Sequence, residues 1–114
     1  MLKAIMTALA TVALAACASV PVAPERVQAS EQAIQAAQAS GADRQPGAAK
    51  YLELARNEMS QAQKLSDGEP RQAETMFARA ESDAKLATAT AKEGTAKADV
   101  QRLSDELKSV SANQ

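Results

Sequence analysis

Residues 70–98 read PRQAETMFARAESDAKLATATAKEGTAKA, and this stretch decides the fold. Apolar residues recur in it at alternating steps of four and three: Ala73, Phe77, Ala80, Ala84, Ala87, Ala91, Gly94 and Ala98. That spacing is the heptad pattern of helices that pack against one another. Because all but one of these residues are alanine or glycine, neighbouring helix backbones can approach closely. The stretch therefore predicts a long helix that begins at Pro70 and packs against other helices.

A second apolar stripe lies upstream, between Pro46 and about Ser66. Its members again recur at helical steps: Ala48, Leu52, Ala55, Met59, Ala62 and Leu65. A shorter helix is expected from about Pro24 to Ala39, with Gly41 suited to its C-terminal cap. The turn at Asp67-Gly68 is short, so the second and third helices should be antiparallel neighbours. We therefore predict an all-α fold, a small antiparallel bundle or hairpin of about three helices with a long, coiled-coil-like C-terminal helix.

The composition indicates a core with little apolar bulk. Alanine fills 28 of the 114 positions, while Tyr51 and Phe77 are the only aromatic residues. An alanine buries little surface, and burial stabilises by about 25 cal/mol per Å². The fold must therefore depend on the high helix propensity of alanine and on close helix packing.

The apolar pattern shifts after Gly94. Ala96, Val100, Leu103, Leu107 and Val110 keep the steps of four and three but fall two positions out of phase with the earlier set. The third helix, at about 40 residues, could also extend well beyond the second, at about 20. Val100, Leu103, Leu107 and Val110 are therefore a candidate interface for a second copy or another protein. Alternatively, the first helix folds back over them, or they remain singly exposed.

Residues 1–17, MLKAIMTALATVALAAC, carry the strongest functional signal. Lys3 precedes an apolar run of about 13 residues, which is shorter than a membrane span and typical of a secretory signal peptide. The end of this run, Leu14-Ala15-Ala16-Cys17, closely resembles the lipobox of bacterial lipoproteins. The resemblance implies cleavage after Ala16 and acylation of Cys17, and two or more acyl chains anchor a protein stably to a membrane.

Two alternatives remain for this segment: an ordinary cleavage site beside an unmodified cysteine, and an uncleaved helical anchor. Cys17 is the only cysteine, so an exported chain offers it no internal disulfide partner, which favours lipidation. No aspartate follows Cys17, as in lipoproteins sent to the outer membrane, so we expect the periplasmic face of that membrane. The predicted organisation is a signal peptide (1–16), a lipidated cysteine and tether (17–25) and a helical domain (26–114).

The sequence offers little for catalysis or cofactor binding. Histidine is absent and the four glycines are scattered singly, so no catalytic residue, metal or cofactor is expected. Ser82 and Lys85 match the S-x-x-K pattern of penicillin-interacting serine enzymes, but the companion motifs are missing. Glu81 and Asp83 are expected on different faces of a solvated helix. With 13 basic and 14 acidic residues and no clustered basic face, nucleic-acid binding is not expected either.

A set of spaced small residues runs along all three expected helices. It comprises Ala33-Ile34 with Ala37, Gly41-Ala42, Pro46 followed by Leu52 and Ala55, Gly68, and then Ala73, Ala80, Asp83-Ala84 and Ala87. By these features, residues 24–95 resemble a family of short, alanine-rich bacterial envelope proteins of unknown function. In that family the domain occurs alone behind a lipobox, or ahead of an outer-membrane-protein-A-like peptidoglycan-binding domain. The resemblance implies a helical envelope domain and supplies no catalytic residue.

Two functions fit these observations. The first is a non-enzymatic structural or protein-interaction module of the periplasm, held to the membrane by lipid on Cys17 and joined through its helices to a partner or to itself. The major murein lipoprotein is similar, but it ends in a lysine joined to peptidoglycan. This chain ends Ser111-Ala112-Asn113-Gln114, so covalent wall attachment is not expected. The second function is a small periplasmic carrier or regulator that binds a hydrophobic ligand or an envelope enzyme, although the alanine seam argues against a roomy cavity.

Overall fold

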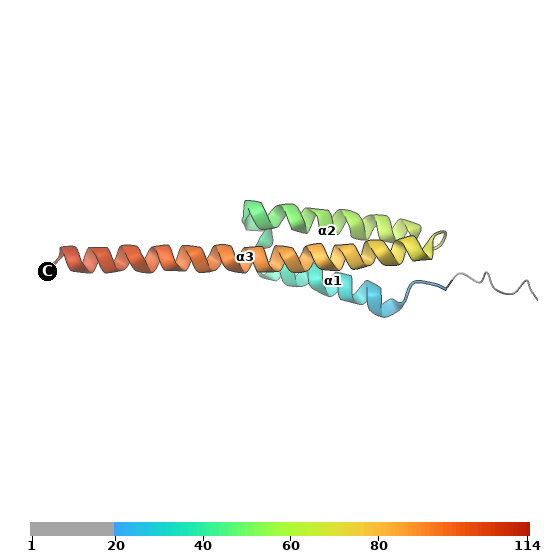
Figure 1. Ribbon diagram of the computed structural model, residues 1–114, viewed down its shortest axis with the longest axis horizontal. Coiled ribbons are helices and arrows are strands. Elements are labelled where there is room, and N and C mark those ends of the chain that lie inside the picture. Colours follow the sequence, from blue (N-terminus) through green and yellow to red (C-terminus); the bar gives the residue numbers. More distant parts are fainter. Residues whose placement is uncertain (1–19) are drawn as a thin grey trace, which may run out of the picture.

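A computed structural model describes residues 20–114, so the expected signal peptide and Cys17 lie outside the described residues. Three α-helices make up most of the described chain: α1 (Pro24–Ala39), α2 (Pro46–Leu65) and α3 (Pro70–Ala112). A single 3-10 turn, η1 (Ala42–Arg44), joins α1 to α2. Residues 20–114 contain no strand. The prediction of an all-α fold with a long C-terminal helix is confirmed (Figure 1).

Proline and glycine set the helix limits. Pro24, Pro46 and Pro70 lie in the first turns of α1, α2 and α3, where a missing N–H breaks no helical hydrogen bond. Gly41, just after α1, has a φ of 76°, in the left-handed region that costs glycine nothing. Its N–H donates to the carbonyl oxygen of Gln38 at 3.0 Å, which completes the predicted glycine cap.

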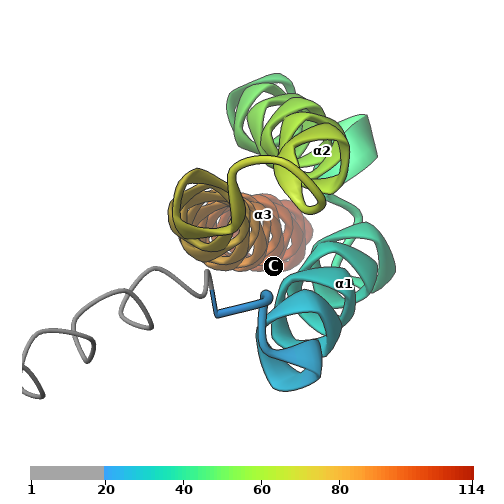
Figure 2. The same cartoon turned by 90° about the vertical axis from the view of Figure 1, so that its right-hand side faces the viewer.

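Both shorter helices pack on the first half of α3 and make few contacts with each other (Figure 2). α1 and α3 run in the same direction, and α2 runs against them (Figure 1). Near the α2–α3 turn, Phe77 packs with Ala62, Ala73 and neighbouring apolar side chains. Nearer η1, the buried residues are mostly alanines, with Leu52 the largest fully buried side chain there. The bundle is therefore slim, and Phe77 and Leu52 supply much of its apolar bulk.

The predicted seam of α3 is confirmed over its first six members. Each is at most 1% exposed: Ala73, Phe77, Ala80, Ala84, Ala87 and Ala91. For the last two members the prediction was wrong, because Gly94 is only partly buried and Ala98 is exposed. α1 ends and α2 begins alongside Ala91, so no helix of the bundle reaches these two residues.

Candidate interaction surface

Beyond the bundle, α3 continues as a single helix (Figure 1). We call residues 96–112 the arm; it is about 25 Å long at 1.5 Å per residue. Every arm residue is exposed except Ser104, which is partly buried. α1 lies alongside the first half of α3 instead of folding back over the arm, so that alternative for covering the candidate interface was wrong.

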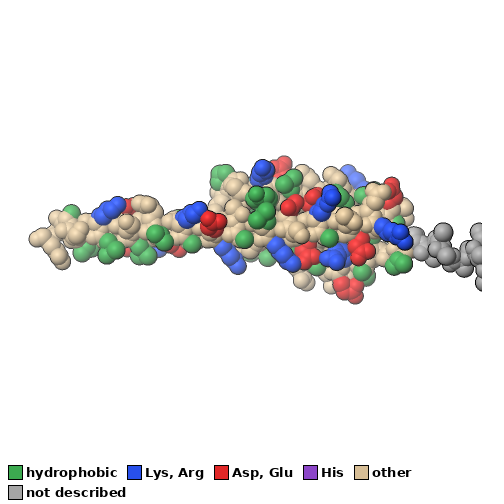
Figure 3. All heavy atoms as spheres, viewed as in Figure 1, with side chains coloured by type: hydrophobic (Ala, Val, Ile, Leu, Met, Phe, Trp, Pro, Cys, Tyr) green, Lys and Arg blue, Asp and Glu red, His purple; other side chains and the backbone are tan. Residues whose placement is uncertain are grey.

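The four predicted interface residues lie along one side of the arm. Their exposed fractions are 68% for Val100, 53% for Leu103, 71% for Leu107 and 57% for Val110. In Figure 3 the hydrophobic side chains of the arm gather along its lower side. Singly exposed apolar residues are common on proteins, but an uninterrupted row of aliphatic side chains marks a binding surface or an aggregation risk.

This row points away from the bundle. If Ala84 and Ala91 occupy heptad position a and Ala87 position d, then Val100 and Leu107 occupy position c. Leu103 and Val110 then occupy position f. Since each helical residue turns by about 100°, positions c and f lie on the opposite side of a helix from a and d. The shift in sequence phase therefore moves the apolar side of α3 from its inner to its outer face.

The outer row begins before Ala96, the residue at which the sequence pattern predicts its start. Positions c and f also hold Leu86, Ala89 and Ala96, and Leu86 is 43% exposed although it lies within the bundle region. We call the whole set the outer stripe: Leu86, Ala89, Ala96, Val100, Leu103, Leu107 and Val110. Only Glu93 interrupts it. Leu86 was missed because it stands next to the inner seam residue Ala87, although the same seven-residue repeat, counted backwards from Val100, reaches it.

Ion pairs within α3 support the arm as a free-standing helix. Lys97 bonds to Glu93 at 2.6 Å, Arg102 to Asp99 at 3.2 Å and Lys108 to Asp105 at 3.8 Å. Pairs at these spacings favour the helical conformation. The hydrogen bond from Lys97 also holds the pKa of Glu93 below its ordinary value. Glu81 and Lys85 form a further pair at the same four-residue spacing as Glu93 and Lys97.

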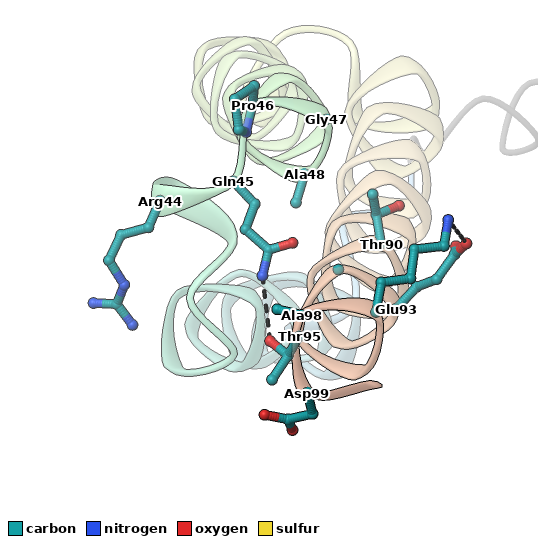
Figure 4. A pocket seen from close by; sticks show the side chains of 12 residues that line it. Arg44, Gln45, Pro46, Gly47, Ala48, Thr90, Glu93, Thr95, Ala98 and Asp99 are labelled. Carbon is teal, nitrogen blue, oxygen red and sulfur yellow. Dashed lines mark hydrogen bonds and ion pairs between the residues drawn. The ribbon is translucent and has the colours of Figure 1, made fainter. Parts of the chain in front are cut away.

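Gln45 connects the base of the arm to the bundle (Figure 4). Its Nε2 donates to the carbonyl oxygen of Ala91 at 2.9 Å and to Oγ1 of Thr95 at 3.3 Å. Gly94 makes this contact possible, since a Cβ at that position would overlap Oε1 of Gln45. A notch of about 590 Å³ opens to solvent around these residues. An open notch of this kind gives little support to the carrier alternative, which needs an enclosed apolar cavity.

Ser82 and Lys85 do not contact each other as a catalytic pair would. The hydroxyl of Ser82 donates to the carbonyl oxygen of Ala78 at 3.1 Å, and Nζ of Lys85 bonds to Oε1 of Glu81 at 2.5 Å. Oε2 of Glu81 also accepts a hydrogen bond from Nη1 of Arg26 in α1 at 3.2 Å, so Glu81 links α1 to α3. The hydrogen bond from Lys85 is the main reason that the pKa of Glu81 lies below its ordinary value.

Asp83 faces α2 and lies beside Glu58. Burial raises the pKa of Glu58, and the neighbouring carboxylate of Asp83 raises it further, while the charge of Arg79 partly offsets both effects. Oε2 of Glu58 is buried and has no hydrogen-bond partner among the described residues. Glu81 and Asp83 do lie on different faces of α3, as expected. The expected solvated surface was wrong for both, because each is half-buried against a neighbouring helix.

Residues 20–114 contain neither a candidate metal site nor a candidate membrane span. Within them, no group of three or more His, Cys, Asp or Glu side chains is placed to hold a metal ion. None of the helices described is long and apolar enough to cross a membrane. The outer stripe is therefore the described feature best suited to binding, and its spacing fits another helix.

Residues 25–103 match the family model described as a domain of unknown function (DUF4398). The matched range contains α2, nearly all of α1, and the outer stripe as far as Leu103. No curated protein and no solved structure matches the chain.

Proposed function

The chain belongs to the DUF4398 family, and from this premise we propose that it is a non-enzymatic, lipid-anchored protein of the bacterial envelope that presents the arm for binding. The anchor is a lipid on Cys17, and the location is the periplasmic face of the outer membrane. The lipobox-like Leu14-Ala15-Ala16-Cys17 and the lack of any other cysteine support this anchor.

The proposal rests on the positions of the two ends of the molecule. α1 begins near the α2–α3 turn, where Val22 and Val27 pack on the Phe77 cluster, whereas the arm ends at the opposite end of the molecule (Figure 1). The chain from Cys17 to Pro24 can span at most about 25 Å, and α3 is about 65 Å long. A lipid on Cys17 would hold the bundle near the bilayer and let the arm tip stand up to about 90 Å away.

The bundle and the arm suit different parts of this task. Buried alanines hold the first half of α3 between two shorter helices, while the arm keeps large aliphatic side chains exposed. Aliphatic side chains at steps of three and four are the usual anchors by which one amphipathic helix binds another. The proposed function is therefore protein binding at a distance from the membrane.

Mass spectrometry of the intact protein from native membranes tests the anchor. We expect a chain that begins at Cys17 and carries acyl chains. A Cys17→Ser variant should keep residues 1–16 and lack the acyl mass. A mature protein with an unmodified Cys17 thiol, or with residues 1–16 still present in the wild type, would contradict the anchor.

Photocrosslinking in cells tests the binding role of the arm. A photoreactive residue at Leu103 or Leu107 should give one discrete crosslinked product, because these side chains are exposed on the outer stripe. The matched control is the same residue at Gln101 or Lys108, which lie on the opposite side of the same helix. Equal yields from both sides, or crosslinks only to α1 and α2, would refute the arm as a binding element.

A further inference from the structure

We propose that the outer stripe of α3 pairs with the outer stripe of a second copy of this chain, with the two α3 helices parallel. The pairing is argued from the stripe itself, and only the shared membrane rests on the proposed function. In this arrangement the two bundles lie on the outer sides of the α3 pair.

The length of the stripe fits a two-stranded coiled coil. From Leu86 to Val110 it spans about 37 Å at 1.5 Å per residue, or between three and four heptads, which is the length that marks a coiled coil. Four of its five large residues fall on the arm, whereas Leu86, Ala89 and Glu93 lie beside the bundle. Pairing should therefore be tightest along the arm.

The bundle leaves room for a second α3. Its two shorter helices cover the inner face of α3, whereas the stripe lies on the outer face. The exposure of Leu86 shows that this outer face is free even where α1 and α2 pack on the inner face of α3. Two α3 helices could thus approach to the usual 8–10 Å between axes without displacing α1 or α2.

Charges beside the stripe favour the parallel orientation. With Val100 and Leu107 now taken as positions a of the pair, Asp99 and Glu106 fall at positions g. Residues at e and g set partner choice and orientation in coiled coils. In an antiparallel pair, the g positions of the two chains face each other. The alignments that keep the two stripes in contact then bring Asp99 opposite Glu106, or Glu106 opposite its own copy.

In a parallel pair, each g residue instead faces the e residue of the next heptad. Asp99 then faces Ser104, and Glu106 faces Ser111, so both carboxylates meet hydroxyl donors. Two like-charge contacts remain at the bundle end of the stripe: Glu93, at position a, faces Glu93 of the second copy, and Lys92 comes near Lys97. Glu93 and Lys97 of each chain are paired at 2.6 Å, which partly offsets both contacts. Along the arm, the parallel pair therefore avoids the acidic repulsion that the antiparallel pairs place there.

The charge balance of the arm favours a helix over a lipid surface as its partner. Its basic residues, Lys97, Arg102 and Lys108, equal in number its acidic residues, Asp99, Asp105 and Glu106. Amphipathic helices that lie on anionic membranes carry an excess of lysine and arginine on the polar face. A surface with equal numbers of positive and negative charges can face an identical surface without net charge repulsion.

The size of the contact explains why the shared membrane matters. A strip about 37 Å long and about 10 Å wide has a footprint of roughly 400 Å² per copy, about half the size of a standard interface. Pairing of this size depends on local concentration. Two copies anchored in one bilayer by their N-terminal ends would meet at high effective concentration and with α3 already parallel.

Cysteine crosslinking of the full chain in cells tests the pairing. Leu103→Cys and Leu107→Cys place a thiol on the stripe, and Gln101→Cys and Lys108→Cys place one on the opposite side as matched controls. All four positions are exposed, so each variant should fold. After oxidation with copper phenanthroline, we expect both stripe variants to form a reducible homodimer, with at least about ten times the yield of the controls.

The possible outcomes separate the pairing from the anchor. Stripe variants that give no more dimer than the controls would overturn the pairing. Dimer only when Leu103→Cys and Leu107→Cys are co-expressed would overturn the parallel orientation, and a disulfide to another protein would overturn the second copy as partner. Dimer of the unsubstituted chain would reveal a free Cys17 thiol and overturn the anchor. The pairing would then be judged by the excess dimer of the stripe variants over the unsubstituted chain.

Discussion

Replacing Phe77 by alanine should remove a large part of the stability of the bundle. Phe77 is 1% exposed and packs between α2 and the N-terminal end of α1. Burial losses and the resulting cavity make Phe→Ala substitutions cost about 3–5 kcal/mol. The buried neighbours Ala62 and Ala73 are too small to fill the cavity. We therefore expect a loss of about 4 kcal/mol.

That loss is large against the total. A domain of this size has a free energy of unfolding of about 5–14 kcal/mol, and 1 kcal/mol shifts the midpoint of a domain below 100 residues by about 4–8 °C. Thermal unfolding of the purified protein, followed by circular dichroism at 222 nm, should show the midpoint of Phe77→Ala lowered by at least about 15 °C.

Leu54→Ala is the matched control, because Leu54 is also a large apolar residue of the bundle but is 42% exposed. It should cost less than about 1 kcal/mol, as surface substitutions usually do. If Phe77→Ala cost no more than Leu54→Ala, Phe77 would not hold this end of the bundle, and the account of the core would be wrong.

Four further substitutions follow from the polar contacts between helices. Glu58→Gln should stabilise the protein at pH 7 by up to about 1 kcal/mol. Because the pKa of Glu58 is raised, its protonated carboxyl stabilises the fold at low pH, and this contribution is lost as the pH rises through that pKa. The gain in stability from Glu58→Gln should therefore vanish near pH 4. Glu81→Gln should behave oppositely, because the pKa of Glu81 is lowered: it should destabilise at pH 7 and become neutral in acid. Urea midpoints at both pH values measure the two effects, and equal changes at the two pH values would contradict them. Gln45→Ala should lower the free energy of unfolding by about 1 kcal/mol, because its hydrogen bonds are lost. Gly94→Ala should be nearly neutral, because it gains about 1 kcal/mol of helix propensity but displaces Gln45. Stabilisation by Gly94→Ala of 1 kcal/mol or more would mean that the Gln45 contact contributes nothing.

The helices could be predicted from sequence because their signals are local. Pro24, Pro46 and Pro70 lie in the first turns of the three helices, and Gly41 caps the first, as the sequence indicated. The inner seam follows from the heptad repeat alone. Its end at Ala91 could not be predicted, because that end depends on how far the two shorter helices reach along α3.

Contacts between helices were harder to predict. Glu58 meets Asp83, and Gln45 reaches Gly94, only because α2 packs on α3 in one register. An alanine-rich seam carries few shape cues, so neighbouring registers look alike in the sequence. The outer row was predicted from Ala96 onward because its phase shift is local. Its extension to Leu86 became visible only once the inner face of α3 had been assigned.

The energetics of the outer stripe connect the arm to the anchor. Fully burying a valine or leucine side chain contributes about 1.5–3 kcal/mol, and the four arm residues are 53–71% exposed. Covering about half of that exposed surface would contribute about 0.5–0.9 kcal/mol per residue, or about 4–7 kcal/mol for a pair of arms. Association of two free proteins costs about 4–15 kcal/mol in lost translational and rotational freedom. A soluble pair would thus be weak, whereas two chains held in one membrane have already lost much of that freedom. The arm and the predicted lipid on Cys17 therefore support each other, since the anchor supplies the local concentration that so narrow a stripe requires.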